Sequence, residues 1–554
     1  MGLFYLLLIF FSLGAAVAWS AVRIIRSLHL LQLDSYSNAR LWKWLWVAPF
    51  QRFFEYRSLL ILSLLLTASL VLGALGFSGG AFLLLGIWPA AAFFLWRNSK
   101  TAPAKKKLVY TGRAIRILFS ALTIWAILAA LAGVYGGWSL PDSPSSHLTL
   151  VPAFILFAGL FLTQLAPLSV VAANALLIPV QSAINGSYLR AAKRRLRDYA
   201  PTVIGITGSY GKTSVKFLLH TLLSERFRAL KTPESYNTLM GVCRVINEQL
   251  RPDHEVFIAE MGAYRPGDIK ELCDLVHPRM GILTAIGPQH LERFKTLENI
   301  EAAKYELIEA LPPSGVAVFN NDDPRCRKLA DRTGGLKVLR YGLDGPPSGL
   351  RVWAEGVTQN AEGLSFILKD SDGHSVPAKI GVLGRHNISN LLAAACVALE
   401  MGCSLEEIAH AFPKVRPVPH RLEPTRGAGG VTVIDDSYNS NPVGAMEALK
   451  VLADFKSGRR VLVTPGMVEL GAMEAQKNED LGAAAAKTCD YVVLVGPQQT
   501  RAILRGLEKE GFAGEKIRVV KGLQEATAEL RTILRPGDVV LFENDLPDLY
   551  LEAK

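Results

Sequence analysis

The sequence has few cysteines, and none of them stands in a C-x-x-C pair. Neither a zinc site nor a disulfide framework is therefore indicated. The six residues all follow position 240 and are Cys243, Cys273, Cys326, Cys396, Cys403 and Cys489. Their number and spacing fit reduced thiols in a cytosolic part of the protein.

The first 180 residues have few ionisable side chains and contain five long apolar runs. The chain is 50% hydrophobic with a mean hydropathy of +0.25, which is high for a soluble protein. A helix of about 20 apolar residues crosses a bilayer, which predicts spans at Leu3–Val22, Leu59–Phe77, Ala81–Trp96, Ile117–Tyr135 and Leu148–Val180. No basic residue precedes the first run, so a signal anchor fits better than a cleaved signal peptide. The alternative is that some of these runs are buried helices of a soluble domain.

The fifth run differs from the others because it contains Gln164 and Pro167. A proline inside a helix removes a backbone hydrogen bond and bends the helix. We therefore expect this run to be kinked, or to continue as a helix along the membrane surface.

Much of the net charge of +11 flanks the apolar runs, which argues for a topology signal and against a nucleic-acid partner. Three segments that flank the apolar runs are basic. Between the first and second runs lie Arg23, Arg26, Arg40, Lys43, Arg52 and Arg57. Between the third and fourth lie Arg97, Lys100, Lys105, Lys106, Lys107, Arg113 and Arg116, and after the fifth come Arg190, Lys193, Arg194, Arg195 and Arg197. The connections at 78–80 and 136–147 have no Lys or Arg. This pattern predicts an external N-terminus and a cytoplasmic location for everything after Tyr199.

From Thr202 onward, short apolar runs alternate with amphipathic stretches, as in α/β domains. Strands are expected at Val256–Ala259, Met280–Thr284, Val316–Phe319, Val338–Tyr341, Val431–Ile434, Arg460–Thr464, Tyr491–Val495 and Asp538–Phe542. The alternation over Gly349–Ile380 predicts hairpins at the edge of the first sheet, before a helix over Asn387–Met401. The prediction is a membrane domain (1–182), a central α/β domain (183–412) and a C-terminal α/β domain (413–554).

One stretch, Gly205–Ser214, has the features of a phosphate-binding loop. A β-branched apolar strand precedes it, and the helical pattern of Val215–Leu223 follows it. In that context Lys212 would reach the β- and γ-phosphates of ATP, and the Thr213 hydroxyl would hold Mg²⁺. The strict G-x₄-G-K-[ST] pattern is not met, because Ile206 occupies the place of its first glycine. A glycine-rich turn with a chance Gly-Lys-Thr is the alternative.

Two further polar residues follow predicted strands. Glu260 ends the strand Phe257–Glu260, and His290 follows Thr284–Gln289. Ligands bind at the carboxyl ends of strands in α/β sheets, so both side chains are candidate Mg²⁺ ligands. A structural or solvated role for either residue is equally compatible with the pattern. The polar stretch Asp435–Pro442 either binds substrate or caps a helix.

Taken together, these segments resemble the Mur ligase family, whose members form amide bonds with ATP during peptidoglycan synthesis. The family loop T-G-[ST]-x-G-K-[ST] matches Thr207–Thr213 in full and accounts for Ile206. Further matches follow in family order over about 350 residues: Glu260–Ala263, His290–Glu292, Lys304–Glu306, Asn320–Asp323, Gly384–Asn390, Arg421–Glu423, Asp435–Pro442 and Gly466–Gly471. The resemblance implies a P-loop Mur-ligase central domain and a Rossmann-like C-terminal domain behind the helical membrane domain.

The resemblance also implies roles for individual residues. Thr207, Gly208, Ser209, Gly211, Lys212, Thr213 and Ser214 would surround the phosphates of ATP, and Thr213, Glu260, His290 and Lys304 would be metal ligands. Lys304 matches the family's carbamylated lysine, whose added negative charge helps to place magnesium. Asn320 would contact adenine, while His386, Asn387, Asn390 and Arg421 would shape the nucleotide cleft. Asp436 and Tyr438 would come from the C-terminal domain that closes over ATP.

The sequence departs from the family at two places. Five predicted spans stand where the family has a soluble domain for the uridine nucleotide of the acceptor. The segment Phe542–Asp548 is acidic where D-Ala-D-Ala-adding enzymes have K-G-S-[RH]. The function expected is amide formation through an acyl phosphate, with D-Ala-D-Ala addition to a muramyl peptide as the reaction. A related ligation on another, lipid-linked envelope precursor is the first alternative.

The expected partners are a small-molecule or lipid-linked cell-wall precursor, an amino-acid or dipeptide amine, and the lipid bilayer. An ATP-driven transporter or an inactive scaffold is the alternative from another class. The near absence of ionisable residues in the spans argues against a transport pathway, and the presence of every metal and phosphate residue argues against an inactive scaffold.

Overall fold

A computed structural model describes residues 2–34, 36–47, 56–98, 107–139, 144–233, 236–343, 348–360, 362–438 and 440–545. The chain forms two compact units, one running to Ile184 and the other beginning at Asn185. Several residues of the sequence argument lie outside the described residues, namely Arg52, Lys100, Lys105, Lys106 and positions 546–548 of the acidic segment.

Among the described residues of the first unit, six helices precede α8. They are α1 (Gly2–Leu33), α2 (Asn38–Val47), α4 (Tyr56–Ala74), α5 (Ser78–Asn98), α6 (Gly112–Ser139) and α7 (Pro144–Leu176). Five contain segments long and apolar enough to cross a membrane: Leu3–Leu33, Tyr56–Ala74, Gly80–Arg97, Gly112–Tyr135 and Leu150–Leu176. The five predicted apolar helices are therefore confirmed. Pro152 and Pro167 lie inside α7, and a second helix, α8 (Ile178–Tyr199), follows it after one residue.

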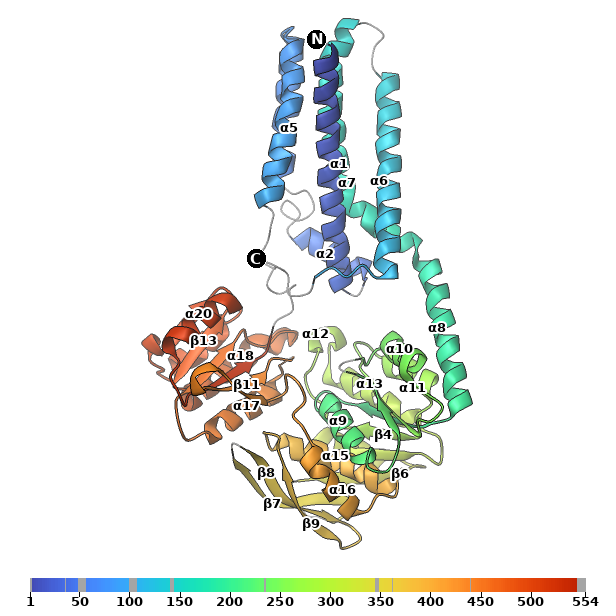
Figure 1. The fold of residues 1–554 in the computed structure, drawn as a ribbon, viewed down its shortest axis with the longest axis vertical. Coiled ribbons are helices and arrows are strands. Elements are labelled where there is room, and N and C mark those ends of the chain that lie inside the picture. Colours follow the sequence, from blue (N-terminus) through green and yellow to red (C-terminus); the bar gives the residue numbers. More distant parts are fainter. Residues whose placement is uncertain are drawn as a thin grey trace. The chain divides into compact units, whose positions relative to one another are not determined.

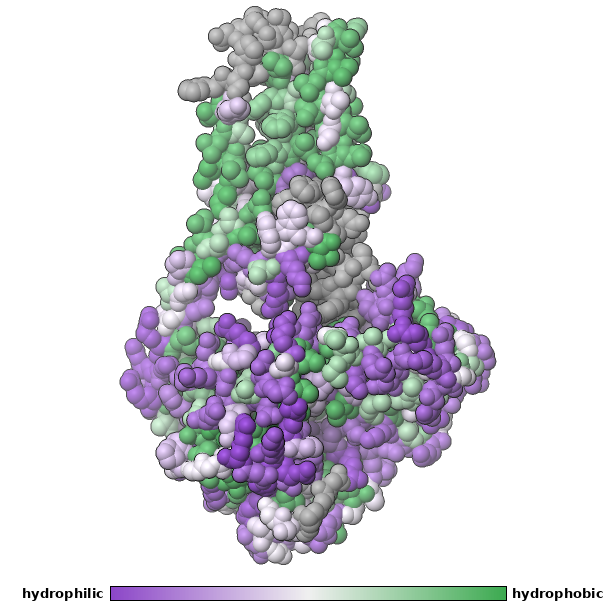
Figure 2. Space-filling view, turned by 180° about the vertical axis from the view of Figure 1, so that it is seen from behind, coloured by the Kyte–Doolittle hydropathy of each residue, from purple (hydrophilic) through white to green (hydrophobic). Residues whose placement is uncertain are grey.

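The helices of this unit pack through apolar side chains and also expose many of them. Residues of α1, α6 and α7 share one buried cluster around Leu28, Ile117 and Ala166. Phe10, Leu64 and Phe119 are among many large apolar side chains that stay more than half exposed. Figure 2 shows the hydrophobic surface that these helices present, in contrast to the mostly hydrophilic face of the α/β unit. Such a surface fits a lipid environment.

Helix α8 runs from the end of the first unit into the second and is amphipathic. Ala192 and Leu196 are buried in a cluster with residues of the α/β unit such as Val242, while Arg194 and Arg197 are exposed on the outer face. The apolar residues recur at helical spacing, so one face packs and the other carries positive charge.

The first α/β sheet has nine strands in the order β2-β3-β1-β4-β5-β6-β7-β8-β9. Its strands are β1 (Thr202–Thr207), β2 (Ala229–Lys231), β3 (Val256–Glu260), β4 (Met280–Leu283), β5 (Val316–Asn320), β6 (Lys337–Gly342), β7 (Val352–Asn360), β8 (Gly363–Asp370) and β9 (Ser375–Ile380). All pairings from β2 to β7 are parallel, and β7-β8-β9 is an antiparallel extension at one edge (Figure 1). The predicted strands and edge hairpins are confirmed.

Helices connect and cover these strands. They are α9 (Lys212–Leu223), α10 (Leu239–Gln249), α11 (Asp268–Val276), α12 (Leu291–Phe294), α13 (Leu297–Glu309), α14 (Pro324–Arg332), α15 (His386–Glu400) and α16 (Leu405–Ala411). Helix α15 packs against α9 through Leu391, Ala394 and Ala395, which are fully buried. This contact fixes the helix that follows the phosphate-binding loop.

The second sheet has six strands in the order β10-β11-β15-β12-β13-β14. They are β10 (Glu423–Arg426), β11 (Thr432–Asp436), β12 (Arg460–Thr464), β13 (Tyr491–Val495), β14 (Ile517–Val520) and β15 (Val539–Glu543), joined by α17 (Pro442–Asp454), α18 (Glu474–Thr488), α19 (Arg501–Lys509) and α20 (Leu523–Ile533). Only β10 is antiparallel to its neighbour. Three strands escaped the sequence analysis, β2, β10 and β14, because they are short edge strands. All six cysteines are buried and unpaired, as expected.

Candidate active site

The phosphate-binding loop lies at the point where the strand order reverses. Strand β1 sits between β3 and β4, so the chain leaves β1 at the edge where α/β sheets bind ligands. Gly208 and Gly211 have φ values of 149° and 80°, which glycine adopts without strain. The backbone N–H of Ser209 donates to Ala285 O at 2.7 Å. The Ser209 hydroxyl donates to Gly287 O and accepts from the Gly287 N–H, both at 3.0 Å. The loop is therefore fastened to the segment after β4.

The loop contacts neighbouring elements at two further places. The Thr207 hydroxyl donates to Met261 O at 3.0 Å. A Cβ atom at Gly211 would stand 2.4 Å from Asn390 Oδ1 on α15. Any side chain at position 211 would therefore displace the Asn390 side chain. Ser214 is partly buried in the first turn of α9.

Lys212 opens α9 and turns back over the loop. Its Nζ donates to Gly208 O at 2.6 Å and to Ser209 O at 3.2 Å. Burial lowers the pKa of Lys212 to about 8, and nearby Glu260 opposes this effect. The loop carbonyls thus hold the ammonium group beside the turn that would receive the phosphates.

Glu260 has three donors around its carboxylate. Thr213 Oγ1 and Asn237 Nδ2 donate to Oε1 at 3.1 and 3.0 Å, and Lys216 Nζ lies 2.8 Å from Oε2. Burial raises the pKa of Glu260, but Lys216 and Lys212 lower it by more, so the carboxyl stays ionised. An ionised carboxylate beside a threonine hydroxyl is an oxygen donor set that suits Mg²⁺.

Lys304 lies on α13 and is 4% exposed. Burial lowers its pKa well below the usual value, and the positive charge of Lys212 lowers it further. The environment thus favours the unprotonated form that carbamylation requires.

His290 occupies a strained backbone position, with a φ of 53°. Its Nδ1 is hydrogen-bonded to Glu469 from the loop after β12, and Arg293 Nη2 donates to the same carboxylate at 3.3 Å. The structure therefore joins Glu260 with Thr213 and joins His290 with Glu469. A shared magnesium ion at Glu260 and His290 stays a prediction.

The residues assigned to the nucleotide cleft have mixed surroundings. Asn320 Nδ2 donates to Thr284 O at 2.9 Å, which places this side chain beside β4. Asn387 and Asn390 on α15 are buried and joined by a hydrogen bond of 3.1 Å. His386 Nδ1 is buried and has no hydrogen-bond partner among the described residues, and burial lowers the pKa of this imidazole. An unpartnered buried nitrogen beside the loop helix is a feature that a ligand can satisfy.

The C-terminal residues of the prediction also lie close together. The Arg421 guanidinium lies 4.6 Å from the centre of the Tyr438 ring. Asp436 ends β11, where it accepts a hydrogen bond of 3.2 Å from the Leu422 N–H. Burial raises the pKa of Asp436 to about 6, and Arg421 opposes this rise. Arg421, Asp436 and Tyr438 therefore belong to one cluster.

Sequence reasoning missed Lys216 and Glu543. Lys216 is fully buried on α9 against Glu260. Glu543 ends β15, is fully buried, and accepts hydrogen bonds from the Ser440 and Thr464 hydroxyls. Burial raises the pKa of Glu543 to about 7. The position of Glu543 directly after a predicted strand is the signal in the sequence that could have found it.

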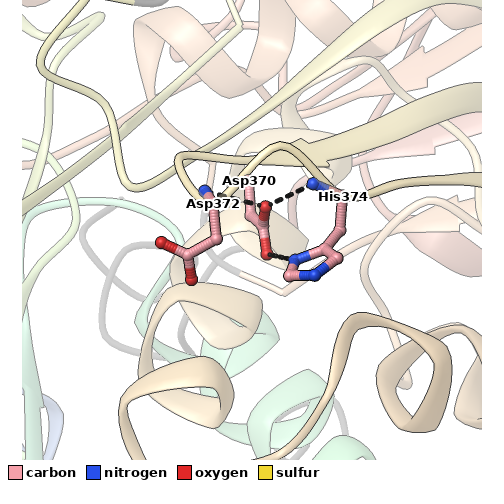
Figure 3. Close-up of side chains that lie close together, drawn as sticks. All are labelled: Asp370, Asp372 and His374. Atoms are coloured by element: carbon pink, nitrogen blue, oxygen red, sulfur yellow. Dashed lines mark hydrogen bonds and ion pairs between the residues drawn. The ribbon is translucent and has the colours of Figure 1, made fainter.

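A second group of possible metal ligands, Asp370, Asp372 and His374, lies in the turn between β8 and β9. Asp370 accepts hydrogen bonds from the N–H groups of Asp372 and His374 and from His374 Nδ1 (Figure 3). Asp372 is paired with Arg351 at 2.9 Å. These interactions explain the three residues as parts of a hairpin turn, without a metal ion.

Two family profiles match the second unit. The Mur ligase middle domain matches residues 206–398, and the domain described as Mur ligase, glutamate ligase domain matches residues 420–543. The two matched ranges cover the phosphate-binding loop, Glu260, Lys304 and the strand end at Glu543.

Relatives and solved structures agree with these matches. The UDP-N-acetylmuramoyl-tripeptide–D-alanyl-D-alanine ligase of Mycobacterium leprae is 34% identical over 365 residues, which are 62% of this chain and 70% of the relative. The enzyme of the same name from Escherichia coli is 32% identical over 61% of this chain and 74% of its own. The structure of MurF ligase from Thermotoga maritima in complex with ADP is 27% identical, with a TM-score of 0.58 over 66% of this chain and 82% of that one.

Proposed function

Because the chain belongs to the Mur ligase family, we propose that it is an ATP-dependent, ADP-forming ligase that makes an amide bond on a cell-wall precursor. The reaction we propose is addition of D-alanyl-D-alanine to a UDP-linked muramyl tripeptide, the reaction named for its relatives. One observation carries the proposal. Lys212 lies over a glycine loop while Thr213, in the same helical turn, is bonded to Glu260.

The first proposed step transfers a phosphoryl group. An oxygen of the acceptor carboxylate attacks the γ-phosphorus of ATP, the bond to the bridging oxygen breaks, and ADP leaves. The loop N–H groups and the α9 N-terminus orient the phosphates, and Lys212 neutralises charge that develops on them. Little covalent chemistry falls to the protein, so positioning and charge supply the acceleration.

The second proposed step forms the amide. The unprotonated amine attacks the carbonyl carbon of the acyl phosphate, the C–O bond to phosphate breaks, and the nitrogen loses a proton. Asp436 ends β11 and Tyr438 lies two residues further on. Together with Arg421 they would hold the nucleotide and the incoming amine from the C-terminal sheet.

The donor set at Glu260 fits Mg²⁺, and the proposed ligands are Thr213, Glu260, His290 and Lys304. Bound there, the ion would neutralise the phosphates of ATP. For Lys304, the neutral amine nitrogen adds to the carbon of CO₂ and loses a proton, which gives a carbamate with one negative charge. The low pKa that burial imposes on Lys304 supports this modification, because an ammonium group would repel the metal.

Acceptor and location are the finer part of the proposal. We propose that the protein lies in the bacterial inner membrane, with the bilayer as a partner of its apolar helices and the ligase unit in the cytoplasm. The exposed basic face of α8, with Arg190, Lys193, Arg194 and Arg197, supports contact with anionic headgroups. A lipid-linked acceptor is the second candidate. Five apolar helices precede the ligase unit, and Glu543 and Asp545 are acidic where the family is basic.

The test measures ADP release by the purified full-length protein with UDP-linked and lipid-linked muramyl peptides, each with and without D-alanyl-D-alanine. The proposal expects release that needs both acceptor and amine and that falls at least about a hundredfold in Lys212→Ala. Lys450→Ala, an exposed lysine on α17, is the matched control. ADP release that ignores the acceptor would point to an ATPase-driven transporter instead.

A truncated protein that starts at Asn185 separates the acceptor candidates, because that residue begins the second compact unit. Equal rates for the truncated and full-length proteins on the UDP-linked acceptor would leave the helices as a tether. A rate on the lipid-linked acceptor that needs the full chain would establish the second candidate.

A further inference from the structure

The first unit contains two arginines at the start of α6 that have only neutral partners among the described residues. Arg113 Nη2 lies 3.4 Å from Asn174 Oδ1, and Arg116 Nη2 lies 2.8 Å from Gln181 Oε1. Both side chains are partly buried. Within the part of the chain that the structure describes, neither guanidinium has a carboxylate within 4.0 Å. Two partly buried positive charges in this position favour binding of an anion.

A polar network holds the Arg113 guanidinium in a fixed position. It lies 4.1 Å from the centre of the Tyr36 ring, which stacks against its face. Tyr36 itself has a φ of 62° in the turn between α1 and α2. Asn174, which is 4% exposed, donates to Tyr36 O at 3.0 Å and to Asn38 Oδ1 at 2.7 Å. The amide oxygen of Asn174 is therefore aimed at Arg113.

The spacing of the two arginines suits one phosphate group or two linked ones. Positions 113 and 116 are three apart on a helix and lie on one face. A guanidinium offers its N–H groups in a planar fork that matches phosphate oxygens, and a fixed fork loses little entropy on binding.

Apolar surface continues directly from this pair. Phe119, one turn along α6 from Arg116, is 65% exposed, and Leu176 and Ile178 at the α7–α8 junction are 70% and 56% exposed. A ligand with a phosphate head and a hydrocarbon tail would place the head on the arginines and the tail along these side chains. A soluble phosphate would leave that surface unused.

We propose that Arg113 and Arg116, with Asn174 and Gln181, form a binding site for the phosphate group of a membrane lipid. Both arginines belong to a connection predicted to face the cytoplasm, where headgroup phosphates and lipid-linked precursors are found. The inference rests on the proposed membrane location of the first unit and not on the ligase chemistry.

The test measures binding by native mass spectrometry of the full-length protein from detergent micelles. Three probes separate the sources: a polyprenyl phosphate, phosphatidylglycerol and free inorganic pyrophosphate. The expected result is binding of one or both lipids that falls about tenfold in Arg113→Gln and in Arg116→Gln. Arg97→Gln, an exposed arginine at the end of α5, should change binding less than about twofold.

A second kind of variant separates a loss of binding from a loss of folding. Gln181→Glu would place a carboxylate on Arg116, satisfy that guanidinium internally, and reduce lipid binding while leaving the thermal midpoint of unfolding unchanged or raised. Lipid binding that is equal in the wild type, Arg113→Gln, Arg116→Gln and Gln181→Glu overturns the proposal, as does binding of free pyrophosphate alone. Ligase activity on a soluble acceptor is measured in parallel, so that a failure of one proposal is seen apart from the other.

Discussion

The Nζ atom of Lys216 lies 2.8 Å from Oε2 of Glu260, and both side chains are buried. Lys212 and Lys216 stand one turn apart on α9 and have different tasks. The first turns over the phosphate loop, and the second keeps the carboxylate of Glu260 ionised in a buried place. A buried ion pair that loses one partner leaves the other charge without compensation.

We therefore predict that Lys216→Met lowers the free energy of unfolding by roughly 3–5 kcal/mol. Adding Glu260→Gln to this variant should restore most of the loss, because no uncompensated charge is left. Mg²⁺ should stabilise Lys216→Met more than the wild type, since the ion can take over as counter-ion. The measurement is urea unfolding of the protein that starts at Asn185, followed by fluorescence of Trp353, its single tryptophan. It gives the free energy of unfolding of the wild type and both variants, each with and without Mg²⁺. Lys450→Met, at an exposed site, is the control.

The Thr213–Glu260 contact was predictable from the sequence, whereas the Lys216–Glu260 pair was not. Residues that end neighbouring parallel strands meet at one edge, so a carboxylate after β3 had to come near the loop after β1. From the sequence pattern alone, Lys216 would be predicted to be an exposed lysine of an amphipathic helix. In the fold, α9 packs beside β3 and Lys216 is buried against Glu260, a residue 44 positions away in the sequence.

Lys304 provides a test of the metal site that does not depend on the acceptor. Lys304→Ala should lower turnover by at least about a hundredfold, because the negative charge that carbamylation supplies is lost. Short carboxylates such as acetate should restore part of the rate by occupying the vacated space. Removing CO₂ from the buffer should slow the wild type and leave the alanine variant unchanged. An alanine variant with full activity and no additive contradicts the assignment.

Gly211 tests how closely the loop must approach α15. Gly211→Ala adds a Cβ 2.4 Å from Asn390 Oδ1 at a φ of 80°, so it should lower the affinity for ATP about tenfold or more. Gly267→Ala is the matched control, because Gly267 also has a positive φ, 93°, but nothing within 4 Å. The control should cost only about 1 kcal/mol of stability and leave ATP binding unchanged. Equal effects in both variants would assign the loss to backbone strain alone.

The orientation of the apolar helices is testable by labelling. Cysteines introduced in the 137–147 connection should react with a membrane-impermeant maleimide added outside, and those in the 98–112 connection should react only after the membrane is opened. All six native cysteines are buried, so background labelling should be low. The opposite pattern would reverse the topology and place the ligase unit away from ATP.

The acidic end of β15 shows where sequence reasoning stops. The segment could be recognised as acidic, and as different from the family, from its letters alone. The hydroxyls of Ser440 and Thr464 reach Glu543 from residues 103 and 79 positions away. Only the strand order, with β15 between β11 and β12, brings those hydroxyls to this carboxyl. A local pattern therefore cannot reveal that Glu543 is buried and hydrogen-bonded.

The buried carboxyl of Glu543 should make the free energy of unfolding depend on pH. Burial raises its pKa from 4.5 to about 7 in the folded protein, and Asp436 adds to the rise. Below pH 4.5 the carboxyl is protonated in both states, so its contribution to stability is complete. Between 4.5 and 7 the unfolded chain binds fewer protons than the folded one, so the free energy of unfolding falls as pH rises, by on the order of 3 kcal/mol in total. Above pH 7 the effect is constant.

Glu543→Gln should remove this dependence. The variant should equal the wild type near pH 4.5 and exceed it near pH 8, because glutamine carries no charge. Its amide oxygen accepts from one of the two hydroxyls, and its NH2 group donates to the oxygen of the other. Asp538→Asn is a control of opposite sign. Although burial opposes it, the Arg459 guanidinium lowers the pKa of Asp538, so its stabilisation is present at neutral pH and is lost as pH falls through the folded pKa. Urea unfolding near pH 4.5 and near pH 8 distinguishes the effect of Glu543 from that of Asp538. If the stability of the wild type does not fall between pH 4.5 and 7 relative to Glu543→Gln, the pKa of Glu543 is not raised and the prediction is wrong.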